Sequence, residues 1–339
     1  MREPPALAPD AIAAALQAGF GIRVAQLEFL AVGNDAASWA FRVGAPDGKA
    51  WFLKVRAGHG RWPGSAVPWH LHRLGVPHVL APLATTAGVP YVEVDGFALA
   101  LYPMLDARPA VEVGLSAEQW RTLGDVVRQV HAVPATPDLT RMVARETFRP
   151  AGRDVAAGLE ALLATAPPGD GVARELAAFW RPRREVVRAL VDRADVMGRQ
   201  LRRSAAPQVL CHGDLHTWNV LVDADNHLWI VDWDEAVLAP RERDLMFVVG
   251  GIGHGLVRPD DTERFLQGYG ETGVDPRLLA YYRTAWAVQD IAAYGEEVLL
   301  TSALGQETRR AALDGFIDLF EPGNIVDLAN RFAGRFGPG

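Results

Sequence analysis

The sequence has one cysteine among its 339 residues, Cys211. A single cysteine excludes an internal disulfide framework. It also argues against a zinc site of the ordinary type, because three or four ligands are needed and Cys211 is accompanied only by His212 and His216, with no HExxH pair. Since Cys211 ends a short apolar run, we expect a small buried residue and not a nucleophile.

Long apolar runs and an excess of positive charge are also missing. No apolar stretch approaches the roughly 18 residues of a membrane span, and the first residues lack the basic and apolar regions of a signal peptide, so a cytoplasmic location is expected. The net charge of −7 argues against a nucleic-acid partner, because phosphate backbones are bound by clustered Lys and Arg. The 49% hydrophobic content is enough for two lobes with separate cores.

One motif in the second half contains the residue types that phosphoryl transfer requires. A polar loop with Asp214 follows an apolar run, and two further apolar runs, 220–222 and 228–231, predict a hairpin that places Asn219 and Asp232 side by side. A carboxylate such as Asp214 can accept the proton of an alcohol, while an amide and a carboxylate oxygen suit Mg²⁺. Asp and Asn also form ordinary turns at strand ends, but the ordered set favours a magnesium site.

The N-terminal third predicts a small antiparallel lobe in which a helix at 9–18 precedes three strands. The predicted strands cover residues 24–32, 38–43 and 50–55. The turn at 33–38 is small and polar enough to fold over nucleotide phosphates through backbone N–H groups, so Gly33, Asn34 and Ser38 are candidate nucleotide-binding residues. An ordinary hairpin loop would have the same composition.

Lys54 lies in the third predicted strand between Leu53 and Val55, where a charge on a half-buried face needs a reason. In kinases a lysine of this strand holds the α- and β-phosphates of the nucleotide. We therefore predict that Lys54 binds nucleotide; a lysine of an edge strand that points into solvent is the alternative.

The rest of the chain predicts further strands and then mainly helices. The additional strands are expected at residues 75–83, 90–95 and 97–101. The helices are expected from a capping box at Ser116 to Pro134 and at residues 152–165, 171–203, 241–249, 260–269, 276–300 and 307–320. Glycines at 250–255 lack the G-x-G-x-x-G order of a dinucleotide site. They form either a loop beside an acceptor pocket, near His254, or a tight connection between helices.

Three segments together resemble the aminoglycoside phosphotransferase family. They are His-Gly-Asp-x-His-x-x-Asn at 212–219, Ile-Val-Asp-Trp-Asp at 230–234 and Pro-Arg-Glu-Arg-Asp-Leu at 240–245. Segments 238–247 and 290–294 are more narrowly similar to spectinomycin phosphotransferases, and the likeness spans nearly the whole chain. It implies an α+β, bilobal protein-kinase-like fold with a small antiparallel β-sheet lobe and a larger, mainly helical lobe.

The resemblance also implies how the chain is divided. Residues 1–101 would form the nucleotide-binding lobe, 102–105 the hinge, and 106–339 the helical lobe with the catalytic loop and the acceptor pocket. The hinge residues Tyr102 and Met104 would lie at the adenine ring, whose hydrogen bonds come from the hinge backbone.

Site roles follow from the same resemblance. Asp214 would be the catalytic base, and Asn219 and Asp232 would bind Mg²⁺ beside ATP. Supporting roles would fall to His212, His216, Asp234 and Asp244, with Asp244 tied to the catalytic loop. The expected partners are a nucleoside triphosphate and a small hydroxyl-bearing acceptor.

The chain departs from this family in the environment of Lys54. Kinase-like folds pair that lysine with a helical glutamate, yet no Asp or Glu occurs between Val55 and Val92, and Trp62 stands where related proteins would carry the acid. Three explanations remain open: another acid such as Asp232 holds Lys54, phosphate positioning is weaker, or the nucleotide binds differently.

The acceptor is expected to contact the helix near the C-terminus. Residues 284–287 read Thr-Ala-Trp-Ala where the family pattern predicts an acid and a base, so Trp286, Asp290 and His254 are the candidate substrate residues; Trp286 could equally be a packing residue. We expect an ATP- and Mg²⁺-dependent antibiotic kinase, with spectinomycin as the first candidate acceptor. Another antibiotic such as a nucleoside antibiotic, a metabolic sugar or amino alcohol, and a non-catalytic binding protein are the alternatives.

Overall fold

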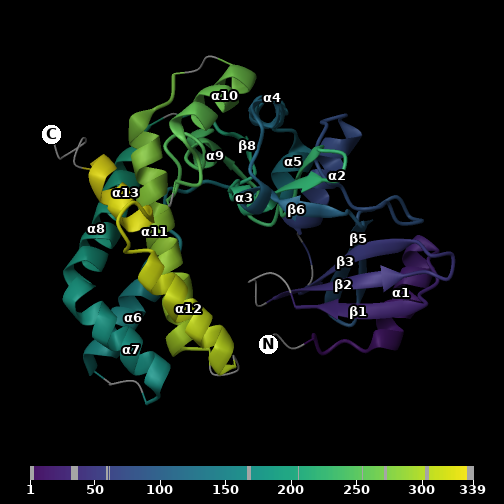
Figure 1. The fold of residues 1–339 in the computed structure, drawn as a ribbon, viewed down its shortest axis with the longest axis horizontal. Helices are drawn as coiled ribbons and strands as arrows, with labels where there is room; N and C mark the ends of the chain where they lie inside the picture. Colours follow the sequence, from purple (N-terminus) through teal and green to yellow (C-terminus); the bar gives the residue numbers. More distant parts are fainter. Residues whose placement is uncertain are drawn as a thin grey trace.

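The computed structural model describes residues 4–31, 37–58, 60, 62–165, 169–204, 206–253, 255–270, 273–301 and 305–333. The chain folds into two lobes, one built around an antiparallel β-sheet near the N-terminus and one that is mainly helical (Figure 1). This arrangement confirms the α+β, two-lobed fold class predicted from the sequence.

The sheet of the N-terminal lobe has five antiparallel strands in the order β1-β2-β3-β5-β4. Its strands are β1 Gln26–Leu30, β2 Ser38–Gly44, β3 Ala50–Ala57, β4 Val92–Val94 and β5 Phe97–Pro103. Helix α1, Pro9–Phe20, packs against the sheet and ends at Gly21, whose φ of 69° is left-handed and suits glycine. The helix therefore ends two residues beyond the predicted end at residue 18, within the glycine-bounded segment 19–21.

The two faces of this sheet differ because successive side chains of a strand point to opposite sides. Leu53 and Val55 belong to the buried apolar core shared with α1. Lys54 lies on the opposite face, where its register partners are Ala40 in β2 and Ala100 in β5. A long cationic side chain is thus flanked by small ones, which leaves space above the sheet on that face.

The predicted strand at 75–83 is wrong. Within this segment Val79 forms only an isolated parallel bridge, to Ile230 of the other lobe. Pro77 and Pro82 have no backbone N–H to donate to a sheet, so the segment cannot join a regular ladder. It instead connects helix α2, Pro63–Arg73, with the sheet, and on the way Leu80 N donates to Ile230 O at 3.1 Å.

The helices of the structure have the following bounds: α2 Pro63–Arg73, α3 Ala110–Val113, α4 Ala117–His131, α5 Pro137–Met142, α6 Arg153–Thr165, α7 Gly171–Trp180, α8 Arg184–Leu201, α9 Glu242–Leu245, α10 Pro259–Tyr269, α11 Pro276–Leu299, α12 Gln306–Asp318 and α13 Ile325–Ala333. Helix α4 starts with the predicted capping box between Ser116 and Gln119. The predicted helix 171–203 is interrupted by a short 3-10 turn, η1 Arg181–Arg183, because Pro182 cannot continue an α-helix.

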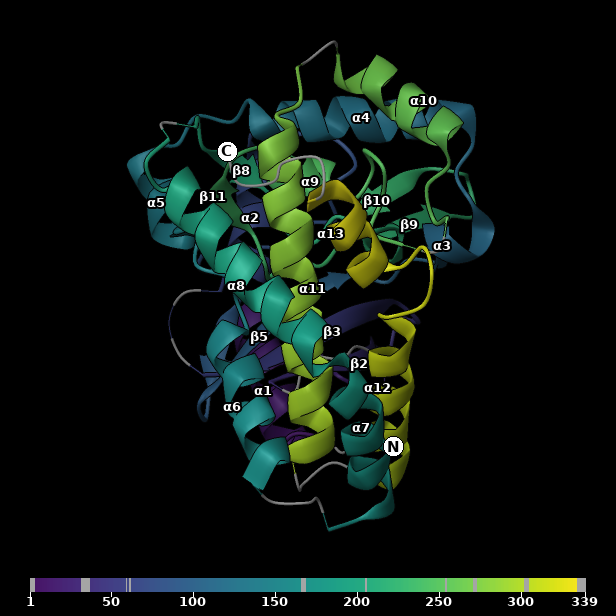
Figure 2. The same cartoon turned by 90° about the vertical axis from the view of Figure 1, so that its left-hand side faces the viewer.

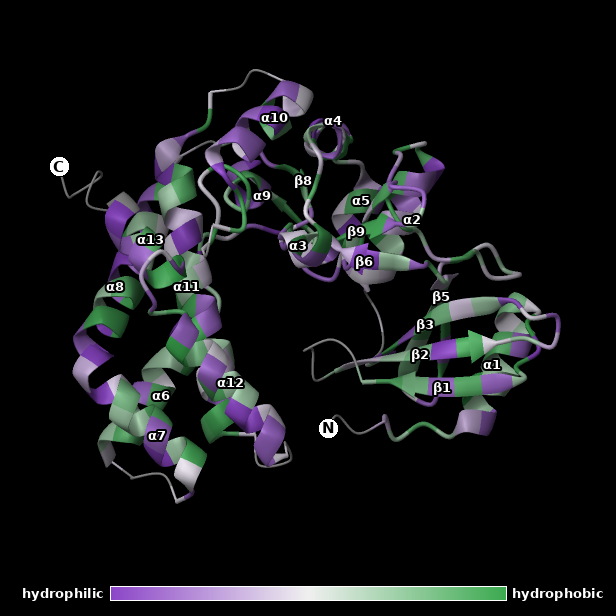
Figure 3. Cartoon of the chain, in the orientation of Figure 1, coloured by the Kyte–Doolittle hydropathy of each residue, from purple (hydrophilic) through white to green (hydrophobic). Residues whose placement is uncertain are grey.

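Helix α11 forms the centre of the helical lobe. Figure 2 shows it surrounded by α6, α7, α8, α12 and α13, and most of its residues are buried. Hydrophobic and hydrophilic residues alternate along most other elements (Figure 3), as expected where one side is buried. Across the described residues, no helix combines the length and the apolar character needed to cross a membrane.

The glycine-rich segment at 250–253 is tied to α11. The guanidinium of Arg283, which is fully buried, donates to the carbonyl oxygens of Gly251 and Val249. A Cβ atom on Gly253 would lie 2.5 Å from the side chain of Asn324, so a larger residue would not fit. Of the two alternatives drawn from sequence, this packing favours a tight connection between helices.

Two small sheets complete the helical lobe and carry the segments in which the sequence predicted site residues. One contains β6 Ala107–Pro109, β9 Val220–Asp223 and β10 Leu228–Ile230; the other contains β7 Ala144–Arg145, β8 Val209–Cys211 and β11 Val237–Ala239. Strands β9 and β10 form the predicted antiparallel hairpin. Val231 N donates to Asn219 O at 3.0 Å, so the residues before β9 and after β10 are adjacent.

Candidate active site

The loop between β8 and β9 presents Asp214 at the strand end. Gly213 precedes it with φ of 85°, and a Cβ atom there would lie 2.2 Å from the carbonyl oxygen of Glu235. Only glycine fits that position. The short 3-10 helix η2, Thr217–Asn219, then returns the chain toward Asp214. The amide nitrogen of Asn219 donates to Asp214 Oδ2 at 2.9 Å and to Asp214 O at 2.8 Å.

Asp244 holds the backbone of this loop through hydrogen bonds. Its Oδ2 accepts from His212 N and its Oδ1 from Gly213 N, both at 2.8 Å. His131 Nε2 lies 3.0 Å from Oδ2, and its other ring nitrogen lies 2.7 Å from the hydroxyl of Tyr269. Burial alone would raise the pKa of Asp244, but the hydrogen bond to His131 and the nearby donors outweigh it, and the pKa is lowered. A charged carboxylate thus fixes the loop that carries Asp214.

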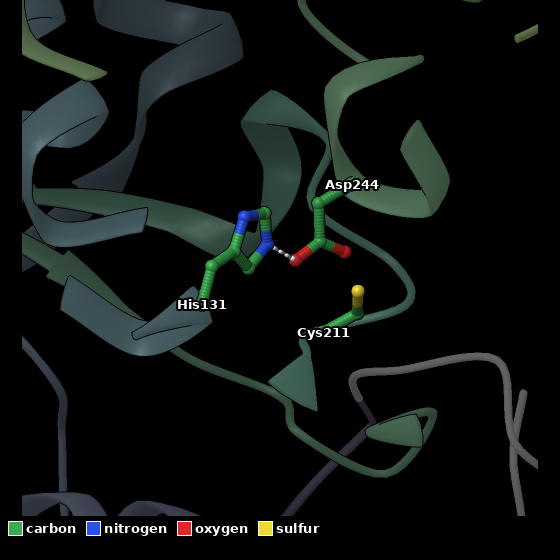
Figure 4. A group of neighbouring side chains, drawn as sticks. All are labelled: His131, Cys211 and Asp244. Atoms are coloured by element: carbon green, nitrogen blue, oxygen red, sulfur yellow. Dashed lines mark hydrogen bonds and ion pairs between the residues drawn. The ribbon is translucent and has the colours of Figure 1, made fainter. Parts of the chain in front are cut away.

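His131, Cys211 and Asp244 place three possible metal-ligand atoms within 4.8 Å of one another (Figure 4). The hydrogen-bonding capacity of this cluster is already used by protein groups, because Asp244 accepts from two backbone N–H groups and from His131. Burial raises the pKa of the Cys211 thiol, which keeps it neutral. We interpret the cluster as a structural anchor, in agreement with the buried role predicted for Cys211.

Asp232 follows β10 and faces the N-terminal lobe. Its φ of 62° is in the left-handed region, which aspartate tolerates better than most residues. Its Oδ1 accepts from Lys54 Nζ at 2.9 Å, and Lys54 also contacts Asp234. Burial lowers the pKa of Lys54, but the two carboxylates outweigh this and raise it, so the ammonium stays charged. Correspondingly, Lys54 lowers the pKa of Asp232 against the effect of its burial.

The residues predicted to bind Mg²⁺ offer a suitable donor set. Because the amide nitrogen of Asn219 is directed at Asp214, the atom that remains for a metal is the amide oxygen. Asp232 adds a carboxylate, about half of whose side chain is exposed. Hard oxygen atoms of this kind, with room for water and phosphate oxygens, fit Mg²⁺.

The wall on the other side of Asp214 is aromatic and charged. His216 Nε2 lies 3.2 Å from Asp214 Oδ1, and its ring makes an edge contact with Phe247, which in turn contacts Trp286. Burial lowers the pKa of His216, but the Asp214 carboxylate outweighs it and the net shift is upward. Removal from water, with the Asp214 charge nearby, raises the pKa of Asp290 to about 7.

Other predicted site residues are placed as follows. Ser38 is buried at the start of β2, and Tyr102 is buried with its hydroxyl donating to Gly64 O at 3.0 Å, so its side chain is a packing group. Met104 is 40% exposed after the end of β5. Gly33, Asn34 and His254 lie outside the described residues. His212 packs against Trp233, with ring centroids 4.6 Å apart, and contacts Val231 O.

Two features of the site were missed by reasoning from the sequence. The indole nitrogen of Trp62 donates to Asp234 Oδ1 at 2.7 Å across 172 residues, a pairing with no local signal. Arg243 lies 5.1 Å from the ring of Trp286, and it lines a cavity of about 160 Å³ that opens beside the loop after β10. The arginines in its wall are Arg145, Arg149 and Arg243, and Glu146 and Glu235 are the acids.

A base candidate held by an amide, a metal-type oxygen pair and a paired lysine across two lobes define a kinase-like phosphotransferase. The chain belongs to the phosphotransferase enzyme family, whose family model matches residues 28–282. It is therefore an enzyme that transfers a phosphate group to a hydroxyl group, as the sequence predicted.

Solved structures agree with this assignment over almost the full chain. A spectinomycin phosphotransferase in complex with ADP and spectinomycin is 27% identical, with a TM-score of 0.84 over 97% of this chain and 99% of that chain. An amicoumacin kinase in complex with AMP-PNP, Ca²⁺ and its antibiotic shares the fold, with a TM-score of 0.63 and 16% identity over 95% of this chain and 97% of that chain. The bilobal kinase-like fold is thereby confirmed.

The sequence match to curated proteins is more local. A 3-deoxy-D-manno-octulosonic acid kinase of Xanthomonas euvesicatoria is 39% identical over 82 residues, which cover 20% of this chain and 33% of the relative. The chain thus spans about a third of the length of the curated relatives it matches.

Proposed function

We propose that this enzyme is an ATP- and Mg²⁺-dependent kinase that inactivates an antibiotic by phosphorylating one of its hydroxyl groups, with a spectinomycin-like aminocyclitol as the first candidate acceptor. The observation that carries this proposal is the likeness, over 97% of the chain, to a phosphotransferase that holds ADP and spectinomycin. The geometry around Asp214 supports it, because base, metal ligands and lysine converge there.

The proposed chemistry assigns a role to each of these residues. Asp214 would accept the proton of the acceptor hydroxyl, while Asn219 donates to its Oδ2 and His216 lies 3.2 Å from its Oδ1, so that the carboxylate is kept in place. Asn219 and Asp232 would hold Mg²⁺, and Lys54 would contact the α- and β-phosphates. Bound Mg²⁺ supplies neutralisation of charge on the phosphate oxygens.

The proposed division of the chain follows these roles. Residues 1–101 would bind the nucleotide, with Gly33, Asn34 and Ser38 at the phosphates. Residues 102–105 would form the hinge against the adenine ring, and residues 106–339 would form the lobe that binds the acceptor.

Asp290 and Trp286 are the proposed acceptor contacts. With its pKa at about 7, Asp290 is partly neutral in the free enzyme, and an ammonium group beside it would favour the charged form. Aminocyclitols carry such groups. The ring of Trp286 contacts Phe247 and the guanidinium of Arg243. It would supply an apolar surface against which a sugar ring packs.

A metabolic sugar is the second candidate acceptor, and one observation favours an acidic one. The cavity of about 160 Å³ near Glu235 has three arginines in its wall, and guanidinium groups bind carboxylates well. The local match to a kinase of a sugar acid points in the same direction.

A product assay separates these candidates. ADP release is measured with MgATP and each member of a panel: spectinomycin, other aminocyclitols, nucleoside antibiotics and 3-deoxy sugar acids. Mass spectrometry then detects the gain of one phosphate. A phosphorylated aminocyclitol supports the first proposal, a phosphorylated sugar acid supports the second, and a product confined to nucleoside antibiotics overturns both acceptor assignments.

A further inference from the structure

Lys54 is held by two carboxylates, and one of them is also the proposed metal ligand. Lys54 Nζ lies 2.9 Å from Asp232 Oδ1 and also contacts Asp234 Oδ2. The lysine side chain is only 16% exposed, so it depends on these partners. If Asp232 were its sole partner, metal binding and lysine positioning would compete for the same carboxylate.

Asp234 is held in place independently of Lys54. Its Oδ1 accepts from Trp62 Nε1 at 2.7 Å and lies 3.5 Å from Arg56 Nη1. The indole of Trp62 is itself fixed, because Trp62 is 2% exposed and packs against Tyr91 with ring centroids 5.7 Å apart. The Asp234 carboxylate thus contacts Lys54 through Oδ2 and is held by Trp62 through Oδ1.

Gly64 makes this contact possible. A Cβ atom at that position would lie 2.1 Å from Asp234 Oδ1 and 3.0 Å from Trp62 Nε1. The backbone of helix α2 can therefore lie next to the Asp234 carboxylate only because residue 64 is a glycine. Between Val55 and Val92 no acidic residue is available to replace Asp234.

We propose that Asp234, clamped by Trp62 across Gly64, is the positioning residue for Lys54, and that it leaves Asp232 free to bind metal. The proposal rests on the proposed nucleotide site. It assigns different roles to the two acids of the Asp-Trp-Asp motif: Asp232 exchanges Lys54 for a metal ion when the nucleotide binds, while Asp234 keeps the ammonium in place throughout.

Calorimetric titration with ADP tests this assignment, with Mg²⁺ present at several concentrations. For Asp234→Asn we expect roughly ten-fold to hundred-fold weaker binding of Mg-ADP, the size of a lost charge-assisted contact. The Mg²⁺ concentration for half-maximal binding should rise too, because Lys54 is then left to Asp232 alone. Trp62→Phe keeps an aromatic side chain but removes the N–H donor to Asp234, so a smaller shift in the same direction is expected.

Gly64→Ala provides an independent perturbation, because its methyl group pushes Asp234 while alanine favours the helix. Gly158→Ala in α6 is the matched control, since a Cβ atom there meets nothing within 4 Å. A variant that only misfolds lowers the binding stoichiometry and leaves the dissociation constant and its Mg²⁺ dependence unchanged.

The outcomes are distinct. Wild-type protein that binds no ADP overturns the proposed function and the role of Lys54 with it. Wild-type binding that Asp234→Asn and Gly64→Ala leave unchanged, in affinity and in Mg²⁺ dependence, overturns only the assignment of Asp234. Weakened affinity with a raised Mg²⁺ requirement in both variants, and no change in the control, supports it.

Discussion

Replacing Asp244 by alanine should destabilise the protein strongly. The substitution leaves His212 N and Gly213 N, both buried, without their acceptor, and it removes the partner of His131. A buried donor left unsatisfied costs about 1–3 kcal/mol, and two such donors are left here. We therefore expect a loss of about 2–6 kcal/mol in the free energy of unfolding.

The assay is denaturant unfolding followed by tryptophan fluorescence, at several pH values. Because the pKa of Asp244 is depressed, its stabilisation is fully present above about pH 4 and is lost as the pH falls through the folded-state pKa. The difference between wild type and variant should thus be largest near neutral pH and shrink in acid. Asp314→Ala, at an exposed position of α12, is the control. A loss below about 1 kcal/mol at pH 7 would refute the anchoring role, since an unpaired buried donor alone costs that much.

Three further predictions concern the site. Asn219→Ala and Asp232→Ala should weaken nucleotide binding in the presence of Mg²⁺ more than in its absence, measured by calorimetry; an equal effect in both conditions contradicts their role as metal ligands. Asp290→Asn should stabilise the protein more at pH 8 than at pH 5 in thermal unfolding. The pKa of Asp290 is raised from 3.8 to about 7, so the folded protein loses stability as the pH rises from about 3.8 to about 7 and this carboxyl becomes charged, whereas asparagine stays neutral. Trp286→Ala should raise KM for the acceptor by roughly ten-fold, with KM for ATP unchanged, since the aromatic contact proposed for the acceptor is removed; an unchanged acceptor KM makes Trp286, which is 7% exposed, a packing residue only.

The elements that the sequence predicted well are those fixed by local chemistry. The hairpin of β9 and β10 follows from two apolar runs around a turn at Asp223 to Asn226, and Asn226 adopts the left-handed φ of 64° that such a turn needs. The start of α4 follows from the capping box at Ser116. Each of these signals lies within a few residues of the structure it specifies.

Features that depend on distant partners could not be predicted. The segment 75–83 has the composition of a strand, but its neighbour is Ile230, more than a hundred residues away, and a single bridge results. The identity of the acid that holds Lys54 could not be predicted for the same reason, because Asp232 and Asp234 lie 178 and 180 residues from Lys54 in the sequence. The motif identified the chemical groups, and the fold determined which of them meet.

Asp214 is the residue proposed to take the proton of the acceptor hydroxyl. Its most direct test is Asp214→Asn, with ADP release in the presence of an identified acceptor and Mg-ADP affinity measured on the same sample. We expect a loss of kcat by roughly two to four orders of magnitude, with nucleotide affinity within a few-fold of wild type. Turnover that remains within ten-fold of wild type would contradict it.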